Sequence, residues 1–219
     1  MTPRNELAWY SAAANKGYTC TGREKTTAIT DKSAVDALRA AAPDLKESME
    51  IGRDDEPEIP NMWPSHFDAE GITFKETMST FFLKLKSLHN TVMRCIALGL
   101  GLDHHFFDDF TTDGDNTLRL LHYPATPKSV FQDNPQQVRA GKHTDYGSIT
   151  LLFQDAVGGL QVRSPRGTWV DAKPIEGTIV VNAGDLLARW SNGRIRSTEH
   201  QVVKVEGEGD IVNARYSCV

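Results

Sequence analysis

Three residues with metal-binding side chains are the first feature of this sequence that could do chemistry: His143, Asp145 and His200. Successive side chains of a β-strand point to opposite faces, so a strand through His143 and Asp145 would place both on one face. With His200 arriving from a distant strand, two imidazoles and one carboxylate would surround a common point. This donor set suits an Fe(II) ion whose remaining coordination positions are open. The spacing therefore predicts a metal centre that can accept exchangeable ligands.

The same three residues could instead form a structural cluster or bind zinc. Structural zinc is held in closed sites rich in Cys and His, and the sequence offers no suitably placed fourth ligand. A catalytic zinc stays compatible with the ligand types. An isolated histidine is more often a surface or packing residue than a metal ligand. We therefore expect no metal role for His66, His89, His104 and His105.

A second pair of polar residues, Arg215 and Ser217, begins 15 positions after His200. Because they are two positions apart, they would also share one face of a strand. A guanidinium presents a planar fork that matches a carboxylate, and a neighbouring hydroxyl can add one more hydrogen bond. Beside an open metal, this pair predicts that a small organic acid is held against the ion, which favours iron over zinc. Arg119, on the same predicted strand face as Tyr123, is the alternative carboxylate-binding residue.

These residues belong to a series of short motifs that resembles the iron/ascorbate-dependent oxidoreductases, which are 2-oxoglutarate-dependent dioxygenases similar to isopenicillin N synthase. The resemblance runs over nearly the whole chain and is densest from Leu118 onward. The motifs that carry it are His-Thr-Asp-Tyr-Gly at 143–147, Ser-Thr-Glu-His-Gln-Val at 197–202, Arg-x-Ser at 215–217, Gly-Gly-Leu-Gln-Val at 158–162, Trp-Val at 169–170 and Val-Asn-Ala-Gly-Asp at 181–185.

The resemblance implies a site and a reaction. The two histidines and the aspartate would bind Fe(II), and 2-oxoglutarate would chelate the ion through its keto acid end. Arg215 and Ser217 would hold the far carboxylate, and the Tyr123 phenol would hydrogen-bond a carboxylate of the same molecule. Using O2, with ascorbate as a candidate reductant, the enzyme would hydroxylate, desaturate or cyclise a small metabolite, and secondary metabolism is one expected setting. Because iron and cosubstrate carry this chemistry, no side chain is expected to act as a catalytic base.

Two other functions stay open. An oxidase like isopenicillin N synthase takes all its electrons from the substrate and needs no 2-oxoglutarate, yet it shares the Arg-x-Ser motif. A non-catalytic binding protein is the other alternative, because the chain looks shortened at both ends relative to the family. The substrate is not indicated by any motif.

The elements that must position these residues are expected in two regions, a helical N-terminal region over 1–112 and a β domain over 113–219. In the first region we predict helices at 6–15, 73–99 and 102–110. Thr73-x-x-Glu76 resembles a capping box, and apolar residues recur every third or fourth position after it. Asp103 is positioned as the cap of the last helix.

The second region consists of short apolar segments separated by turn residues, which is typical of strands. The predicted strands are 117–123, 148–154, 159–163, 168–171, 178–182, 194–203 and 211–217. Asn192-Gly193 predicts a hairpin turn, a further turn is expected at 207–209, and Asp185 is expected to hold the turn before the next strand. The expected class is mainly β with flanking helices, and the resemblance implies a double-stranded β-helix, or jelly-roll, core.

Composition and charge limit the partners. A net charge of −5 and a pI of about 5.8 argue against nucleic acid or an anionic membrane as the main partner. The longest apolar run, 95–100, is far too short to span a bilayer. Cys20, Cys95 and Cys218 form neither a metal-binding spacing nor a disulfide framework, and the first residues lack the apolar stretch of a signal peptide. We expect a cytoplasmic protein whose partners are a small-molecule substrate and O2; its oligomeric state is not indicated.

Overall fold

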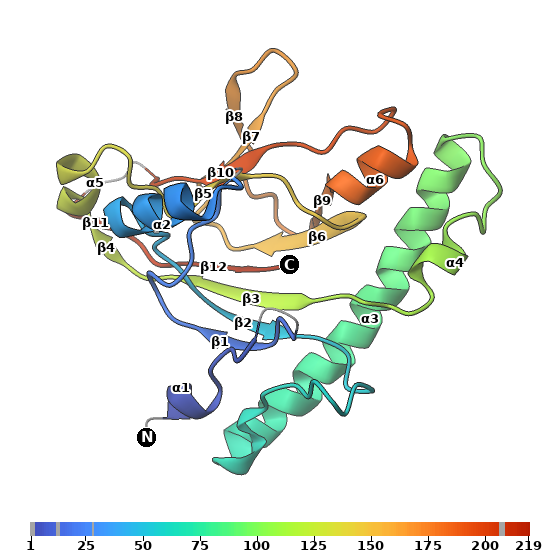
Figure 1. Ribbon diagram of the computed structural model, residues 1–219, viewed down its shortest axis with the longest axis horizontal. Coiled ribbons are helices and arrows are strands. Elements are labelled where there is room, and N and C mark those ends of the chain that lie inside the picture. Colours follow the sequence, from blue (N-terminus) through green and yellow to red (C-terminus); the bar gives the residue numbers. More distant parts are fainter. Residues whose placement is uncertain (1–2, 12–13, 28, 206–208) are drawn as a thin grey trace. The chain divides into compact units, whose positions relative to one another are not determined.

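The computed structural model describes residues 3–11, 14–27, 29–205 and 209–219 (Figure 1). The chain forms two compact units that interleave along the sequence. The first comprises residues 1–18 and 49–119, and the second comprises residues 19–48 and 120–219. Strands β1 (Gly17–Thr19), β2 (Glu47–Ile51) and β3 (Leu118–Tyr123) contain the three points where the chain passes from one unit to the other. The turn predicted at 207–209 lies largely outside the described residues.

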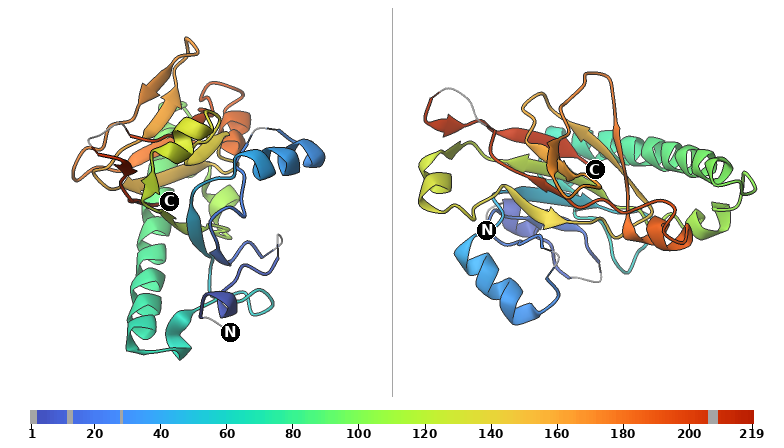
Figure 2. Two further views of the ribbon diagram at one scale, coloured as in Figure 1. Left: turned by 90° about the vertical axis from the view of Figure 1, so that its left-hand side faces the viewer. Right: turned by 90° about the horizontal axis from the view of Figure 1, so that it is seen from above.

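The first unit is mainly helical in its described residues. Its helical elements are α1 (Pro3–Glu6), the 3-10 helix η1 (Pro64–His66), α3 (Ala69–Gly99) and α4 (Asp108–Thr111). Figure 2 shows α3 as a single unbroken helix. Its predicted end at Gly99 is confirmed, but its predicted start at Thr73 is wrong. The N-cap is Asp68, whose carboxylate accepts a hydrogen bond from the Gly71 amide at 2.7 Å, so the cap lies one turn earlier.

Two other helix predictions in this unit are wrong in extent. The segment predicted as a helix at 6–15 stops being helical at Glu6, and Ala8 instead forms a parallel bridge with Tyr18. Gly17 permits this pairing: its φ is +112°, and a Cβ there would lie 2.8 Å from the Leu7 carbonyl oxygen. The helix predicted at 102–110 is a series of turns that ends in α4, although Asp103 does accept a hydrogen bond from the His105 amide.

The second unit contains two sheets whose strands pair antiparallel. Four neighbouring strands of one sheet run in the order β3 (Leu118–Tyr123), β12 (Arg215–Cys218), β6 (Ile149–Gln154) and β9 (Val180–Ala183). In the other the order is β5 (Ala140–His143), β10 (His200–Val202), β7 (Leu160–Arg163) and β8 (Trp169–Asp171). A short ribbon pairs β11 (Ile211–Val212) with β4 (Thr126–Pro127), and the helices are α2 (Lys32–Ala41), α5 (Ser129–Asp133) and α6 (Asp185–Trp190).

Most predicted strands of this unit are confirmed to within about two residues. Two are wrong in extent: 211–217 is interrupted between β11 and β12, and only the last part of 194–203 is a strand. Asn192-Gly193 does not form a hairpin turn. Both residues have positive φ, 51° and 76°, and they end α6, because the left-handed conformation that Asn and Gly tolerate also terminates helices.

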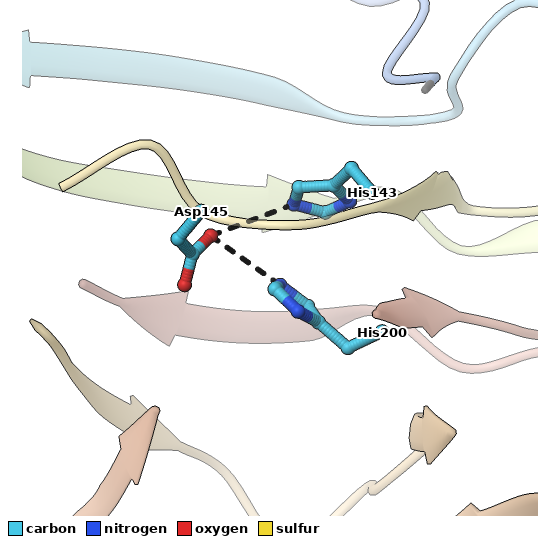
Figure 3. Close-up of side chains that lie close together, drawn as sticks. All are labelled: His143, Asp145 and His200. Carbon is cyan, nitrogen blue, oxygen red and sulfur yellow. Dashed lines mark ion pairs between the residues drawn. The ribbon is translucent and has the colours of Figure 1, made fainter. Parts of the chain in front are cut away.

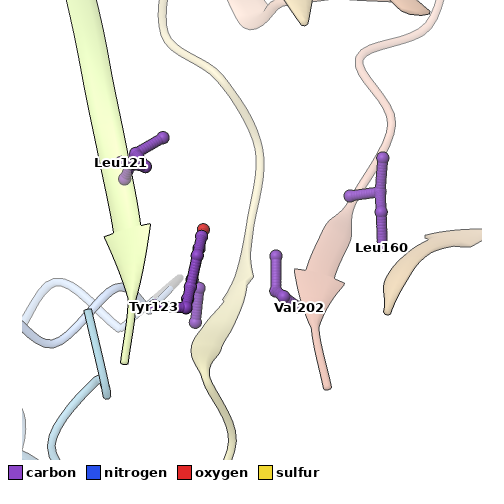
Figure 4. Close-up of a cluster of buried hydrophobic side chains, with 5 residues drawn as sticks. Leu121, Tyr123, Leu160 and Val202 are labelled. Atoms are coloured by element: carbon purple, nitrogen blue, oxygen red, sulfur yellow. The ribbon is translucent and has the colours of Figure 1, made fainter. Parts of the chain in front are cut away.

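A cluster of buried side chains packs between the two sheets (Figure 4). Leu121 and Tyr123 come from β3, and Ala140, Leu160 and Val202 come from the opposing sheet. Each large apolar side chain buried here contributes roughly 1.5–3 kcal/mol of transfer free energy. The expected mainly β chain with helices is confirmed. Among the described residues, no helix has the length and apolar character needed to cross a membrane.

Candidate functional site

His143, Asp145 and His200 come together in the second unit (Figure 3). One ligand atom from each lies within 4.8 Å of the other two. The Nε2 atoms of His143 and His200 lie 3.8 and 3.5 Å from Oδ1 of Asp145. The register explains the histidine pair, since His143 of β5 and His200 of β10 are directly opposite in the antiparallel ladder.

Backbone carbonyls fix the orientation of both imidazoles. Nδ1 of His143 lies 2.8 Å from the Gly141 carbonyl oxygen, and Nδ1 of His200 lies 3.0 Å from the Thr198 carbonyl oxygen. A carbonyl oxygen can only accept, so each Nδ1 donates its hydrogen there, and Nε2 is the nitrogen directed at Asp145 that offers a lone pair in a neutral imidazole. This is the arrangement by which proteins orient histidines that bind metals.

The carboxylate of Asp145 is held through one oxygen only. Its Oδ2 accepts hydrogen bonds from the Thr150 hydroxyl at 2.7 Å and the Asn182 side-chain amide at 2.6 Å. Oδ1 therefore remains directed at the two imidazoles. Asn182 was not predicted to have a role at the site, and its place in the Val-Asn-Ala-Gly-Asp motif was the signal that could have found it.

Asp145 does not lie on a strand, which corrects the expectation that a single strand carries both residues of His-x-Asp. β5 ends at His143, and Asp145 follows in a loop that the start of α6 holds in place. The Asp185 amide donates to the Asp145 carbonyl at 2.7 Å. Gly184 allows this close approach, because a Cβ there would lie 2.1 Å from the Gly147 carbonyl oxygen. Asp185 thus begins a helix, α6, and does not hold a turn before a strand; its carboxylate accepts a hydrogen bond from Thr144.

Burial, and then the neighbouring His200, lower the pKa of His143 to about 4, against the opposing effects of the Gly141 carbonyl and Asp145. A neutral imidazole with a free Nε2 is the form that binds a metal. Among the described residues, His143, Asp145 and His200 form the one group of His, Cys, Asp and Glu side chains that could hold an ion, with no fourth member. Two imidazoles and one carboxylate, without a closing ligand, fit Fe(II) better than structural zinc.

Arg215, Ser217 and Tyr123 also come together. In the β12–β3 ladder Arg215 is opposite Tyr123, and Ser217 is opposite Leu121, so all these side chains share one face. That face is the interior one: Tyr123, Arg215 and Ser217 are 3%, 1% and 8% exposed. Because Val202, two residues after His200, packs in the same cluster as Tyr123, the metal-binding group and this group both belong to the space between the two sheets.

The Arg215 guanidinium is held by three acceptors. It donates to the Gly158 carbonyl at 2.8 Å, the Ser217 hydroxyl at 3.0 Å and the Gln154 side-chain oxygen at 3.3 Å. Gln154 was not predicted from the sequence; its position at the end of β6, opposite Ser217, brings it here. Arg119, the alternative carboxylate-binding residue, instead pairs with Glu50 at 2.6 Å.

The remaining histidines lie outside the metal-binding group. His66 pairs with Glu6, His105 with Asp108, and His122 with Glu47. His89 is 8% exposed on α3, and His104 contacts the ring of His105.

Known proteins resemble this chain over most of its length. The sequence model of the 2OG-Fe(II) oxygenase superfamily matches residues 114–219. The 2-oxoglutarate-dependent dioxygenase frbA of Dothideomycetidae sp. is 36% identical over 204 residues, which cover 90% of this chain and 59% of that protein. The proline hydroxylase buaE of Petromyces alliaceus is 36% identical over 207 residues, which cover 93% of this chain and 61% of that protein. The chain thus spans about three fifths of the length of these relatives.

One solved protein, from Neurospora crassa, is more similar. Its full-length crystal structure in complex with alpha-KG and thymine is 57% identical, with a TM-score of 0.88, over 99% of this chain and 65% of that one. A C-terminally truncated form of the same protein is 50% identical, with a TM-score of 0.76, over 99% of this chain and 68% of that one. Together with the sequence match and the grouping of His143, Asp145 and His200, these likenesses show that the chain belongs to the 2OG-Fe(II) oxygenase superfamily.

Proposed function

We propose that this chain is an Fe(II)- and 2-oxoglutarate-dependent dioxygenase that acts on a small molecule. One observation carries the proposal: between the same two sheets, the two-histidine, one-carboxylate group accompanies a buried arginine and serine that can bind an organic acid. We further propose that the two sheets form a jelly-roll core and that residues 113–219 are its dioxygenase domain. A cytoplasmic location and ascorbate as reductant stay predictions from the sequence.

Each residue has a role in this proposal. His143, Asp145 and His200 would hold the iron through Nε2, Oδ1 and Nε2. When bound, iron and 2-oxoglutarate would activate O2, with oxidative decarboxylation of 2-oxoglutarate to succinate. Arg215 and Ser217 would donate hydrogen bonds to the far carboxylate, and Tyr123 would add its phenol. Their burial excludes water and strengthens these charge-assisted bonds.

The similar Neurospora protein favours a pyrimidine base as the substrate. It binds thymine and alpha-KG in its crystal, and it is 57% identical over 99% of this chain. The proline hydroxylase favours an amino acid substrate instead, but its identity is lower, at 36%. We therefore propose thymine or a related pyrimidine as the first substrate class, and an amino-acid-derived metabolite as the second.

An anaerobic titration of the purified protein with Fe(II) and then 2-oxoglutarate tests the proposal. We expect a visible charge-transfer band from the chelate in the wild type and none in His143→Ala. In Arg215→Ala we expect the band only at much higher 2-oxoglutarate concentration. Asp171→Ala, a change at an exposed residue of β8, is the matched control and should behave as the wild type. Iron binding without any band would overturn the proposed use of 2-oxoglutarate.

Oxygen uptake then separates the enzymatic alternatives. With thymine present, consumption of O2 should require 2-oxoglutarate and should produce succinate in equal amount. Uptake that needs no 2-oxoglutarate would indicate the oxidase reaction instead. Uptake with proline but not with thymine would favour the second substrate class.

A further inference from the structure

Arg139 is a fully buried arginine that neither the sequence motifs nor the proposed mechanism uses. It has no exposed surface, and it directly precedes β5, the strand that carries His143. Its guanidinium donates to the Tyr123 carbonyl at 2.8 Å, the Pro124 carbonyl at 3.0 Å and the Asn213 carbonyl at 2.8 Å. One side chain thus joins the end of β3 to the residues that lead into β12.

These acceptors adjoin the residues proposed to bind 2-oxoglutarate. Tyr123 is itself one of those residues, and Asn213 lies two positions before Arg215. The guanidinium carbons of Arg139 and Arg215 lie over the Tyr123 ring, 5.4 and 5.0 Å from its centroid. Arg139 therefore contacts Tyr123 through both the backbone and the ring, and it fixes the backbone from which Arg215 projects.

The charge of Arg139 lies in an unusual environment. In the part of the chain that the structure describes, no carboxylate pairs with Arg139 or Arg215 within 4.0 Å. Burial, and then the charge of Arg215, lower the pKa of Arg139 to about 10. Two buried cations without a paired anion are costly in the free protein, and an anion bound between the sheets would offset that cost.

The hydrogen bonds to backbone carbonyls do not by themselves explain why a charged residue is buried at position 139. Bonds to three carbonyl oxygens hold two segments together, but a neutral donor could make such bonds without the cost of burying a charge. The positive charge is informative because it lies next to a second buried cation. Its position suggests a contribution to the field that attracts the far carboxylate of a bound acid.

We propose that Arg139 is a positioning residue for the cosubstrate: it holds Tyr123 and the start of β12 so that the phenol and the Arg215 guanidinium meet the far carboxylate of 2-oxoglutarate. This inference rests on the proposed function. It assigns Arg139 no direct contact with the cosubstrate, and it predicts an effect on the end of the molecule that carries the second carboxylate.

The test compares two keto acids on Mn(II)-loaded protein by isothermal titration calorimetry, without turnover. 2-Oxoglutarate carries the far carboxylate, and 2-oxovalerate has a methyl group in its place. The variants are Arg139→Met, which keeps volume without charge, and Arg139→Lys, which keeps charge without the planar fork. Arg39→Met, at a partly exposed residue of α2 paired with Asp36, is the matched control. Thermal melting and Mn(II) affinity are measured on each variant.

In Arg139→Met we expect the Kd of 2-oxoglutarate to rise roughly 10- to 100-fold, because a displaced group can cost that much. The Kd of 2-oxovalerate and of Mn(II) should change less than about twofold. Arg139→Lys should give a Kd of 2-oxoglutarate between those of Arg139→Met and the wild type. If Arg139→Met does not fold, the result for Arg139→Lys alone tests the proposal. An equal change for both keto acids, or none for either, would overturn the positioning role. If the wild type binds Mn(II) but does not prefer 2-oxoglutarate to 2-oxovalerate, the proposed function itself is wrong.

Discussion

The two ends of the candidate site are built in opposite ways. At the metal end, the side chains of His143, Asp145 and His200 are 26%, 21% and 15% exposed, and neutral groups hold them: carbonyls, a hydroxyl and an amide. At the acid-binding end, Arg139 and Arg215 are 0% and 1% exposed, and neither forms an ion pair within 4.0 Å with a carboxylate of the described residues.

In the proposed function, the difference follows from what each end would bind. A metal with open positions must exchange ligands, so its protein donors need access, and their uncharged neighbours leave their donor atoms available. A dicarboxylate is recognised through its charge, and a buried guanidinium binds it more strongly than an exposed one would. The comparison therefore predicts that substitutions at the two ends affect different ligands.

Removing a metal ligand should have the largest effect. Asp145→Ala eliminates the oxygen that faces both Nε2 atoms, so Mn(II) binding should weaken beyond the roughly 100-fold limit seen for residues that only support a ligand. 2-Oxoglutarate binding should be lost with it, because the keto acid end needs the metal. Calorimetry with each ligand measures both. If 2-oxoglutarate still bound without metal, the two ends would be independent sites.

Arg215→Ala should affect the second ligand alone. It removes a buried charge-assisted donor, which should raise the Kd of 2-oxoglutarate at least about 100-fold. Mn(II) affinity should stay within about twofold of the wild type, since the substitution is remote from the ligand atoms. Arg215→Lys should recover only part of the affinity, because an ammonium cannot form the planar fork. A loss of Mn(II) binding in Arg215→Ala would indicate collapse of the space between the sheets.

Cys218 reports on the face of β12 opposite to the one that carries Arg215 and Ser217. Burial raises the pKa of its thiol to about 11, whereas Cys20 and Cys95 are exposed. A shift of about two pKa units means roughly 100-fold less thiolate at pH 8, so Cys218 should react about 100-fold more slowly with a thiol reagent. Because the pKa of Cys218 is raised, its fraction of thiolate, and with it its reaction rate, should keep rising with pH up to about 11. Mass-spectrometric mapping of the labelled cysteines checks this, and equal rates for the three would mean that the end of β12 is open.

The sequence predicted the donor types better than the segments that hold them. His143, Asp145 and His200 were identifiable from the spacing, and the shared face of Arg215 and Ser217 follows from the alternation of strand side chains. The loop that carries Asp145 was not predictable, because it depends on amides at the start of α6 that are 40 residues away in sequence. The helix at 185–190 was not predicted, since six residues carry too little periodicity to identify a helix.

Arg139 and Gln154 were missed for a related reason. Their functions depend on partners from other strands, and neither stands in a motif whose residue types point to chemistry. Thr73 was chosen as a cap because it fits a local pattern, while Asp68, one turn earlier, makes the hydrogen bond. Local sequence patterns therefore identify candidate residues, and the strand register of the folded chain determines which of them meet.

Asn182→Ala should have the smallest effect of this series and bears most directly on how the metal end is supported. It removes one of two hydrogen bonds to Oδ2 of Asp145, and Thr150 still donates the other at 2.7 Å. Mn(II) affinity should therefore fall about tenfold, the lower part of the range for supporting residues, with no separate effect on the preference for 2-oxoglutarate over 2-oxovalerate.

The double variant Asn182→Ala/Thr150→Val should lose more affinity than the two single changes combined, because only then can the carboxylate rotate away from the imidazoles. Strictly additive losses in this cycle would show that the two bonds act separately, and that the orientation of Asp145 is set by its backbone in the loop before α6.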